Sequence, residues 1–413
     1  MKKVNFSPLL IAMLVIFSVI SCTKNTDKNI TKTEQQKVAT NEMIGENGAN
    51  PDESIVGSLS AGARNSSDAD ERDGRGGHFL YTETNNAGTN EILIYKINSD
   101  GTLHHNGSTA SGGSGTGAGL GSQGALILDD EHEWLFAVNA GSNSVSSFRV
   151  HDDGSLKLVH TESCRGKTPV SLSVHDNLLY VLNTGSDNIH GFKVDEDGRL
   201  SHIDGSTQSL SGVGVNAPQI SFTPNGNWLI VTEKATNNLV SFKLKNNGAV
   251  WPAVVTASTG ATPFGFEFAR DNFMVVSNAA GGAAGAGSAT SYVIGANGKP
   301  HDINGAIPNH EAAPCWVAVT KFGRFAFLTN TASNSVSSYY VAPNGSLYLV
   351  RQVAASTNDG PVDIVVAKNN YDVFVLNGKA KTIGEYHRTF FGGLSSMGSV
   401  GGLPASVTGL TTY

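Results

Sequence analysis

The sequence predicts an all-β protein, a seven-bladed β-propeller of four-stranded antiparallel blades. Only 15% of the 413 residues are charged and 48 are glycine, a composition that favours short strands and tight turns. One short apolar run that ends in a polar residue recurs seven times, at 79–83, 135–139, 179–183, 229–233, 274–278, 326–330 and 373–377. Successive runs end 44 to 56 residues apart, which suits one four-stranded unit per repeat.

Each repeat has the same internal order. A proline or an equivalent residue opens a first strand, as at 169–174, 218–223 and 314–319, and the apolar run forms the second strand. The third strand ends in an aromatic residue, as at 142–148, 186–192, 236–242 and 333–339. A glycine turn then leads to the fourth strand, and its Asn-Gly and Asp-Gly pairs supply the positive φ that tight hairpins need.

The two ends of the repeat region indicate a closed ring. The first repeat begins at His78 with no opening strand before it, and residues 404–408 have the form of an opening strand with no apolar run after it. We expect 404–408 to pair beside 79–83 and complete the first blade, because an open array would leave exposed sheet edges. Two β-sandwiches or an open solenoid are the alternatives, and neither explains the split first repeat.

The N-terminus resembles that of a bacterial lipoprotein. Lys2 and Lys3 precede an apolar run at 9–20 that is short for a membrane span, and Ser21 stands directly before Cys22. Residues 1–22 are therefore predicted to be a lipoprotein signal peptide with a lipobox ending at Cys22, which carries the lipid. An ordinary leader that contains a cysteine is the alternative. The polar residues 23–75 are expected to form a disordered tether, and 76–413 the propeller.

These features place the protein in the bacterial cell envelope, lipid-anchored to a membrane. The periplasmic side is favoured over the surface, because no acidic cluster follows Cys22. The formal net charge of −7 becomes −9 when two lysines leave with the leader, so nucleic acid is not an expected partner. We expect a monomer. Cys164 and Cys315 fall in non-neighbouring blades and are expected to remain thiols.

The repeat Leu-Tyr-Val-Leu-Asn at 179–183 resembles the Tyr-Val-Thr-Asn class of propeller repeats. Over 78–413 the chain is similar to the lactonase-family propellers, which include 6-phosphogluconolactonase and carboxymuconate cyclase. Residues 260–266 and 313–319 resemble a secreted branch of that family, here with a lipoprotein leader. The resemblance implies a seven-bladed propeller that hydrolyses a small cyclic ester, such as a sugar lactone. A small-molecule lactone or a carbohydrate is then the expected ligand.

The chain departs from the family at two strand openings. The characterised enzymes have a His-Pro-His opening in an early blade and a Pro-Arg-His opening in a middle blade. This chain has Ser122-Gln123-Gly124 and Pro218-Gln219-Ile220 at those places, so the family arginine and histidines are absent there. The acidic residue that closes the second strand of the middle blade is retained as Glu233. The activity therefore does not follow from the fold.

Two rings of side chains are expected at one mouth of the channel, since the start of each first strand lies beside the end of the second. The second strands end in Glu83, Asn139, Asn183, Glu233, Asn278, Asn330 and Asn377. The first strands bring Gln123, Gln219, Phe264, Cys315, Trp316 and Asp363, with His310 and Glu311 on the approach. The asparagines favour a structural role in which each amide bonds its own turn, whereas the two glutamates break the repeat rule and are better functional candidates.

If the protein hydrolyses a lactone, Glu233 is the candidate base that activates water. Amides of Gln219, Asn278 or Asn183 would donate to the oxyanion, and His310 would be the acid, although a surface-loop histidine is the alternative. Substrate binding is assigned to a set of residues around the same mouth: Glu83, Gln123, Asn183, Asn278, Trp316 and Asp363. For Trp316 the alternative is an aromatic of the blade core.

No cofactor is expected. Carboxylate and amide oxygens at the mouth would suit Ca²⁺, but no Asp-rich loop specifies such a site. The glycine-rich run 281–287 precedes no helix and is not a phosphate loop, and 111–121 is expected to be a flexible loop over one face that acts as a lid. Whether the protein is an enzyme stays open, because a non-enzymatic propeller that binds a glycan, peptide or envelope partner at the channel mouth fits the sequence as well.

Overall fold

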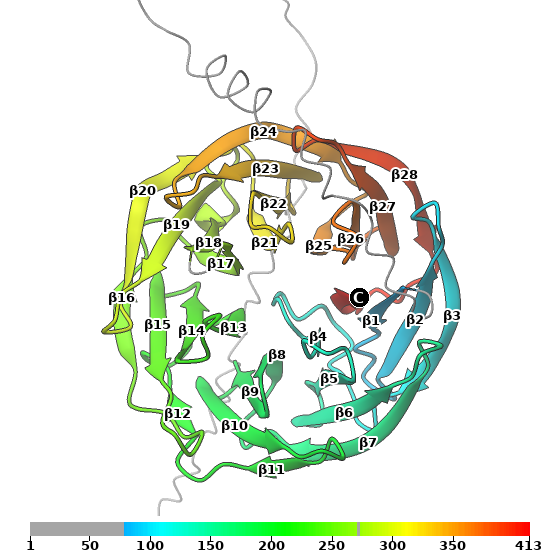
Figure 1. Cartoon of the computed structure of the whole chain (residues 1–413), viewed down its shortest axis with the longest axis vertical. Coiled ribbons are helices and arrows are strands. Elements are labelled where there is room, and N and C mark those ends of the chain that lie inside the picture. Colours follow the sequence, from blue (N-terminus) through cyan, green and yellow to red (C-terminus); the bar gives the residue numbers. More distant parts are fainter. Residues whose placement is uncertain (1–77, 271–272) are drawn as a thin grey trace, which may run out of the picture. The chain divides into compact units, whose positions relative to one another are not determined.

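The computed structural model describes residues 78–270 and 273–413. Seven antiparallel sheets stand around one axis, each with its first strand nearest the centre and its fourth at the rim (Figure 1). The predicted seven-bladed propeller is therefore confirmed. The predicted signal peptide, Cys22 and the tether at 23–75 lie outside the described residues.

Four blades hold the N-terminal half of the ring. Blade 1 consists of β29 (Thr408–Thr412), β1 (Phe79–Glu83), β2 (Glu91–Ile97) and β3 (Leu103–Ala110). Blade 2 consists of β4 (Leu126–Leu128), β5 (Trp134–Asn139), β6 (Ser144–Val150) and β7 (Leu156–Ser163). Blade 3 consists of β8 (Pro169–His175), β9 (Leu178–Asn183), β10 (Asn188–Val194) and β11 (Leu200–His202), with β12 (Gln208–Ser209) also paired to β10. Blade 4 consists of β13 (Gln219–Phe222), β14 (Trp228–Glu233), β15 (Asn238–Lys243) and β16 (Val254–Ala257).

Three blades complete the ring. Blade 5 consists of β17 (Pro263–Ala269), β18 (Phe273–Asn278), β19 (Ser288–Ile294) and β20 (Pro300–Pro308). Blade 6 consists of β21 (Pro314–Val319), β22 (Phe325–Asn330), β23 (Ser335–Val341) and β24 (Leu347–Ser356). Blade 7 consists of β25 (Pro361–Val366), β26 (Asp372–Asn377), β27 (Thr382–Arg388) and β28 (Leu394–Gly401). The third strands begin two residues later than the sequence predicts.

The second strand of each blade is the apolar run that the sequence repeats. In β14, β22 and β26 every residue is buried, because both faces of these strands pack against neighbouring blades. Fourth strands such as β24 are mostly exposed at the rim. A strand buried on both faces needs a continuous apolar run rather than an alternating one, which explains why the run is the strongest signal in the sequence.

Contacts between blades depend on the glycines of the turns before the fourth strands. Gly198 has φ +76°, and a Cβ added there would lie 2.1 Å from the ring of Trp134 in the preceding blade. Gly298 stands in the same relation to Trp228, at 2.2 Å with φ +78°. These turns therefore need glycine for its positive φ and for close approach to an aromatic ring.

The described residues contain one short 3₁₀ turn, Ala280–Gly282, and no helix long and apolar enough to span a membrane. The 3₁₀ turn lies in the connection between β18 and β19, so the run 281–287 is a loop between strands, as the sequence predicts.

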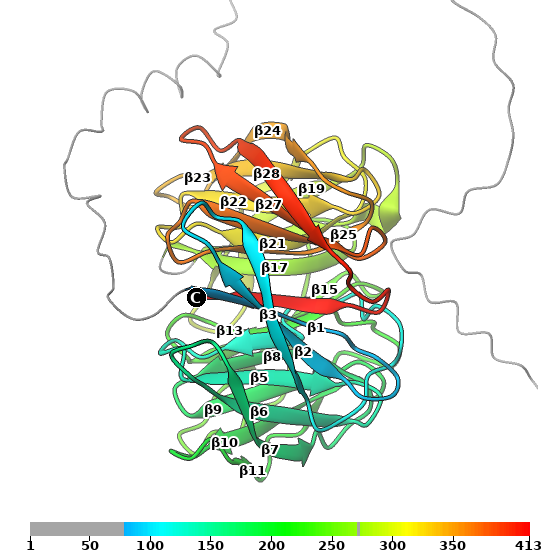
Figure 2. The ribbon, with the colours of Figure 1, turned by 90° about the vertical axis from the view of Figure 1, so that its right-hand side faces the viewer.

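The C-terminal strand closes the ring by pairing with β1 (Figures 1 and 2). Thr408 lies opposite Glu83 and Thr412 opposite Leu80, so the strand is 408–412. The expected strand at 404–408 is thus placed about four residues too early, because Val407 N–H bonds the Pro404 carbonyl in a turn before the strand. The last residue adds aromatic contacts, since the ring of Tyr413 stacks 5.3 Å from that of His132 in blade 2.

Deletion of residues 403–413 should destabilise the entire ring, because it removes the inner strand of blade 1 and exposes the edge of β1. We expect the melting temperature to fall by about 10 °C or more, or the cooperative transition to disappear. Thermal unfolding followed by circular dichroism checks this. Tyr413→Ala, which removes the ring contacts and the hydroxyl but leaves β29 in place, is the matched control and should lower the melting temperature by a much smaller amount. Equal melting curves for the deletion and the full chain would rule out this role for β29.

Candidate functional site

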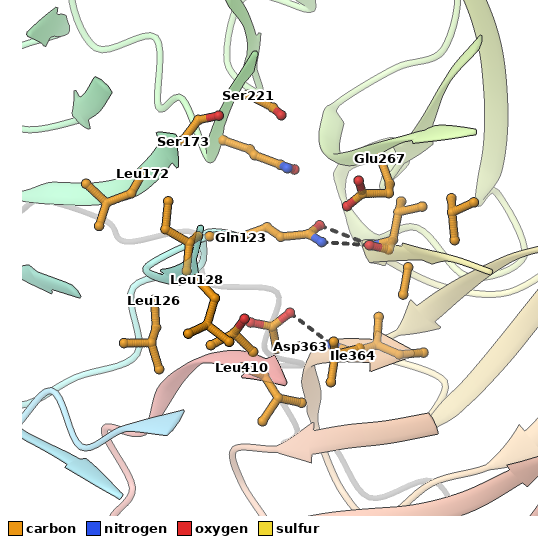
Figure 3. A pocket seen from close by; sticks show the side chains of 18 of the residues that line it. Gln123, Leu126, Leu128, Leu172, Ser173, Ser221, Glu267, Asp363, Ile364 and Leu410 are labelled. Carbon is orange, nitrogen blue, oxygen red and sulfur yellow. Dashed lines mark hydrogen bonds between the residues drawn. The ribbon is translucent and has the colours of Figure 1, made fainter. Parts of the chain in front are cut away.

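The inner strands of the seven blades surround a cavity of about 350 Å³ (Figure 3). Its lining comes from the first strands of every blade and includes Gln123, Ser173, Gln219, Ser221, Glu267, Asp363 and Thr411. Apolar side chains such as Leu126, Leu172 and Ile364 complete the wall. A cavity of this size with a few polar groups in an apolar wall is typical of a small-molecule site.

One end of this cavity is closed by the chain itself. The segment before β4 reaches into the centre of the ring (Figure 1), and the side chain of Gln123 extends from blade 2 to blade 6. There its Nε2 donates to the carbonyl of Val317 at 2.6 Å, and its Oε1 accepts from the N–H of Val317 at 3.1 Å. The backbone N–H of Gln123 donates to the carbonyl of Pro218 in blade 4 at 3.1 Å. Gln123 therefore ties three blades together across the centre.

The preceding residues of this segment, 111–122, are bonded to the ring as well. Asn85 of blade 1 donates from Nδ2 to the carbonyl of Ala118 and accepts from the N–H of Gly117 with its own carbonyl. Lys234 of blade 4 donates to the carbonyl of Gly121 at 3.0 Å. The segment thus lies across the mouth at which the first strands begin, and its action as a lid stays a prediction.

At the opposite end of the cavity the lining residues are more exposed to water. The lining extends to Asp130, Val319 and Val366, at or beyond the carboxyl ends of their first strands. Asp130 is exposed there. A ligand would therefore enter at the mouth opposite to the one that the sequence singled out.

Gln219 lines the cavity but is fully engaged with the neighbouring blade. Its Oε1 accepts from the N–H of Phe266 at 2.7 Å, and its Nε2 donates to the carbonyl of the same residue at 2.8 Å. Ser171 and Ser173 bond the next blade in a similar way, accepting from the N–H groups of Ile220 and Phe222. These side chains satisfy backbone groups on the inner edges of the blades, which no further strand can reach.

Glu233 does not line the cavity. It is fully buried at the end of β14, where its carboxylate accepts from the N–H of Ser211 at 2.9 Å and from the hydroxyls of Ser211 and Thr236. In blade 3 the equivalent Asn183 donates instead to the carbonyl of Cys164 at 3.1 Å. The loop before the first strand presents donors in blade 4 and an acceptor in blade 3, which explains why a carboxylate replaces the amide. The catalytic role of Glu233 stays a prediction that these surroundings do not support.

The other members of that ring are buried inside their blades. Asn278 donates to the hydroxyls of Ser288 and Thr290, and it does not line the cavity. Glu83 is fully buried with one bond from Asn90 at 3.2 Å, and burial raises its pKa well above the usual value. Glu83, Glu233 and Asn278 are thus engaged with neighbouring protein groups, and a shared entrance formed by this ring stays a prediction.

The residues expected on the approach are also apart from the cavity. His310 is exposed in the loop before β21, which matches the alternative of a surface histidine. Trp316 is buried, packs 4.9 Å from the ring of Phe264 and donates from its indole N–H to the carbonyl of Ser122 at 2.7 Å. It belongs to the blade core. Of the predicted site residues, those that line the cavity are Gln123, Gln219 and Asp363.

Glu267 is the functional candidate that the sequence analysis missed. It lies in β17, and its carboxylate extends into the cavity (Figure 3). The side chain is accessible to water, yet the surrounding wall partly removes its hydration, and this desolvation raises its pKa to about 7 in spite of a bond from the backbone N–H of Phe268. A carboxylate with a pKa near neutrality can both accept and return a proton.

The strand register shows how Glu267 differs from its equivalents in other blades. Glu267 lies opposite Val275, three positions before the end of β18. The residues at the corresponding position of other first strands are Ile127, Ser173, Ser221, Ala318 and Val365. A carboxylate is the exception in this inner layer of apolar and hydroxyl side chains. An exception inside a repeat indicates function more strongly where the side chain faces a cavity.

Asp363 is the second carboxyl group of the cavity. It lies in β25 and is 2% exposed. Burial raises its pKa well above the usual value, although the backbone N–H groups of Ile364 and Leu410 act in the opposite direction. The raised pKa makes Asp363 easier to protonate than an exposed aspartate, and in its protonated form it can donate a hydrogen bond to a ligand.

No group of three or more His, Cys, Asp or Glu side chains among the described residues is arranged to hold a metal ion. Ca²⁺ bound by carboxylate and amide oxygens stays the alternative that the sequence analysis gave. Cys164 and Cys315 are both buried and, within the described ranges, form no disulfide.

Comparisons with known proteins agree with the fold. Residues 89–217, which contain most of blades 1 to 3, match the family model described as "Lactonase, 7-bladed beta-propeller". No curated protein matches the chain significantly. This match, together with the seven sheets around one axis, confirms the resemblance to lactonase-type propellers.

Solved structures give the same architecture at low sequence identity. A putative 6-phosphogluconolactonase from Bacteroides fragilis is similar with a TM-score of 0.68 and 18% identity, over 83% of this chain and 100% of that one. A putative 6-phosphogluconolactonase from Bacteroides uniformis gives 0.66 and 16%, over 82% and 100%. The periplasmic gluconolactonase of Pseudomonas aeruginosa gives 0.63 and 17%, over 80% and 98%. At these identities the likeness establishes the fold alone.

Glu83→Gln should stabilise the protein increasingly as the pH rises. The folded state keeps Glu83 protonated while the unfolded chain releases that proton above about pH 4.5, so the wild type loses stability between that pH and the raised folded-state pKa. Glutamine cannot ionise and avoids this loss. We expect equal stabilities near pH 4 and a higher melting temperature for the variant at pH 8, measured by thermal unfolding at several pH values. Glu196→Gln, at an exposed position, is the control and should show no such trend; a Glu83 variant that behaves like it would contradict a neutral Glu83.

Proposed function

We propose that this lactonase-type propeller hydrolyses a small cyclic ester in its central cavity, with Glu267 as the group that activates water. The observation that carries the proposal is a carboxylate with a pKa near 7 in a water-accessible cavity at the axis of the ring. The family resemblance supports hydrolysis of a lactone, and the geometry supports Glu267 instead of Glu233 as the base.

The proposed reaction needs two kinds of group. Ionised Glu267 takes a proton from water as the water oxygen attacks the lactone carbonyl, and a donor stabilises the oxyanion that forms. Protonated Asp363 is one donor in the cavity, and the hydroxyl of Ser173, which accepts from a backbone N–H at 2.9 Å, is another. When the ring C–O bond breaks, Glu267 returns its proton to the leaving oxygen. The product is the open hydroxy acid, and Glu267 is ionised again.

The second candidate function is binding of a small carbohydrate in the same cavity without turnover. One observation favours it: the amides of Gln123 and Gln219 spend both polar atoms on backbone groups. Of the three amides that the sequence suggested as oxyanion donors, Gln219 is therefore already used, and Asn183 and Asn278 do not line the cavity. The two candidates differ in whether Glu267 is needed for turnover.

A further part of the proposal concerns location. The lipobox-like residues before Cys22 support a lipid-anchored protein on the periplasmic side of the bacterial envelope. We expect cells that express the chain to incorporate labelled palmitate into it, and Cys22→Ser to abolish the label. Equal labelling of the variant would contradict an anchor at Cys22.

Glu267→Gln should lower kcat/KM for aldonolactones by about 100-fold or more, the size typical of a lost general base. Because the base must be ionised, the wild-type rate should rise with pH through about 7 and then level off, after correction for spontaneous hydrolysis. Lactone hydrolysis measured by acid release in a pH-stat checks both expectations.

Glu233→Gln is the matched control, because it makes the same chemical change at a carboxylate outside the cavity. It should keep the pH profile of the wild type, with any loss confined to stability. Full activity of the Glu267 variant would remove Glu267 from the mechanism. Absence of turnover by the wild type on every lactone of the panel would leave binding as the function, to be measured by calorimetry with the same compounds.

A further inference from the structure

We propose that the cavity selects a single uncharged sugar lactone and rejects its phosphorylated counterpart. This inference rests on the proposed function and names the substrate class of the same site. It is carried by the charges of the cavity wall, by the closed end at Gln123 and by the position of the open end.

The wall of the cavity is acidic. Among the described residues that line it, Asp130, Glu267 and Asp363 are the ionisable ones, and there is no Lys, Arg or His. A phosphate group carries nearly two negative charges at pH 7, and binding it normally requires cationic side chains or converging N–H donors. In this cavity a phosphate would lose hydration without such partners and would lie near the negative charges of Asp130 and of ionised Glu267, which is unfavourable.

The open end adds to this effect. Asp130, which lines that end, belongs to the turn 129–133, whose sequence is Asp-Asp-Glu-His-Glu. Gln123 occupies the other end, where it spans the axis and bonds Val317. Asp130 therefore adds a negative charge at this end of the cavity, which disfavours the approach of an anion.

The closed end also limits the size of the ligand. A cavity of about 350 Å³ with one entrance accommodates a single sugar ring but gives a longer chain no exit. Hydroxyl groups of such a ring have partners in the wall, namely Ser173, Ser221 and Thr411. The cavity thus suits a neutral polyol lactone.

The test compares D-glucono-1,5-lactone with 6-phospho-D-glucono-1,5-lactone on the full-length protein. We expect kcat/KM for the phosphorylated compound to be lower by on the order of 100-fold, and the difference to shrink at high salt because salt screens the repulsion at the entrance. Asp130→Lys should raise the ratio of kcat/KM for the phosphorylated lactone to kcat/KM for the neutral lactone by about 10-fold or more. Asp152→Lys, at an exposed position outside the cavity lining, is the matched control and should change neither value.

Equal or better hydrolysis of the phosphorylated lactone would overturn this inference while leaving the proposed function in place. If neither lactone is hydrolysed, the proposed function fails, and the selectivity is then read from binding. Calorimetry with D-glucono-δ-lactam and its 6-phosphate, which resist hydrolysis, should show the neutral compound binding at least about 10-fold more tightly. Equal affinities, or no binding of the neutral lactam, would overturn the inference.

Discussion

The pairing of β29 with β1 is the constraint on which the rest of the structure depends. Residues 408–412 bring the end of the chain back to the blade in which it began, so one hydrogen-bonded sheet joins both ends of the ring. The closed ring places the seven first strands around the axis. Everything found at the centre follows from this arrangement, because an inner strand has a partner on one side only.

The free inner edges explain why so many polar side chains near the axis are engaged in structure. No further strand fits there, so Gln219 and Gln123 bond backbone groups of other blades, and Ser171 and Ser173 bond those of the next one. Because these side chains already bond backbone groups, they are not available to a ligand at the mouth where the first strands begin. The polar groups left for a ligand are then Glu267, Asp363 and the hydroxyls deeper in the cavity.

The fold could be predicted from the sequence because its main determinants are local and repeated. Fully buried second strands require apolar runs, and the turns before the fourth strands require glycines such as Gly198 and Gly298. Strand boundaries that depend on the pairing partner were harder to predict from the sequence. Residues 404–407 have the composition of a strand, but only the register with β1 shows that the strand begins at Thr408.

The site was harder to predict for a related reason. Sequence position places Glu233 and Asn183 at the ends of second strands, yet it does not show that the loop before each first strand covers them. Both Glu233 and Glu267 are exceptions inside a repeat, but Glu233 lies in the buried ring. Glu267 replaces the apolar or hydroxyl residue that other first strands have at the same position, and only the register between first and second strands shows which positions correspond.

The bridge from Gln123 to Val317 ties the structure to its number of blades. In a repeat protein each unit contacts mainly its neighbours, so most contacts between adjacent blades do not depend on how many blades there are. A bond that joins blade 2 to blade 6 does, because the span across the axis changes with the number of blades. A ring of six or eight such blades would hold these two residues at a different distance and would lose the bridge.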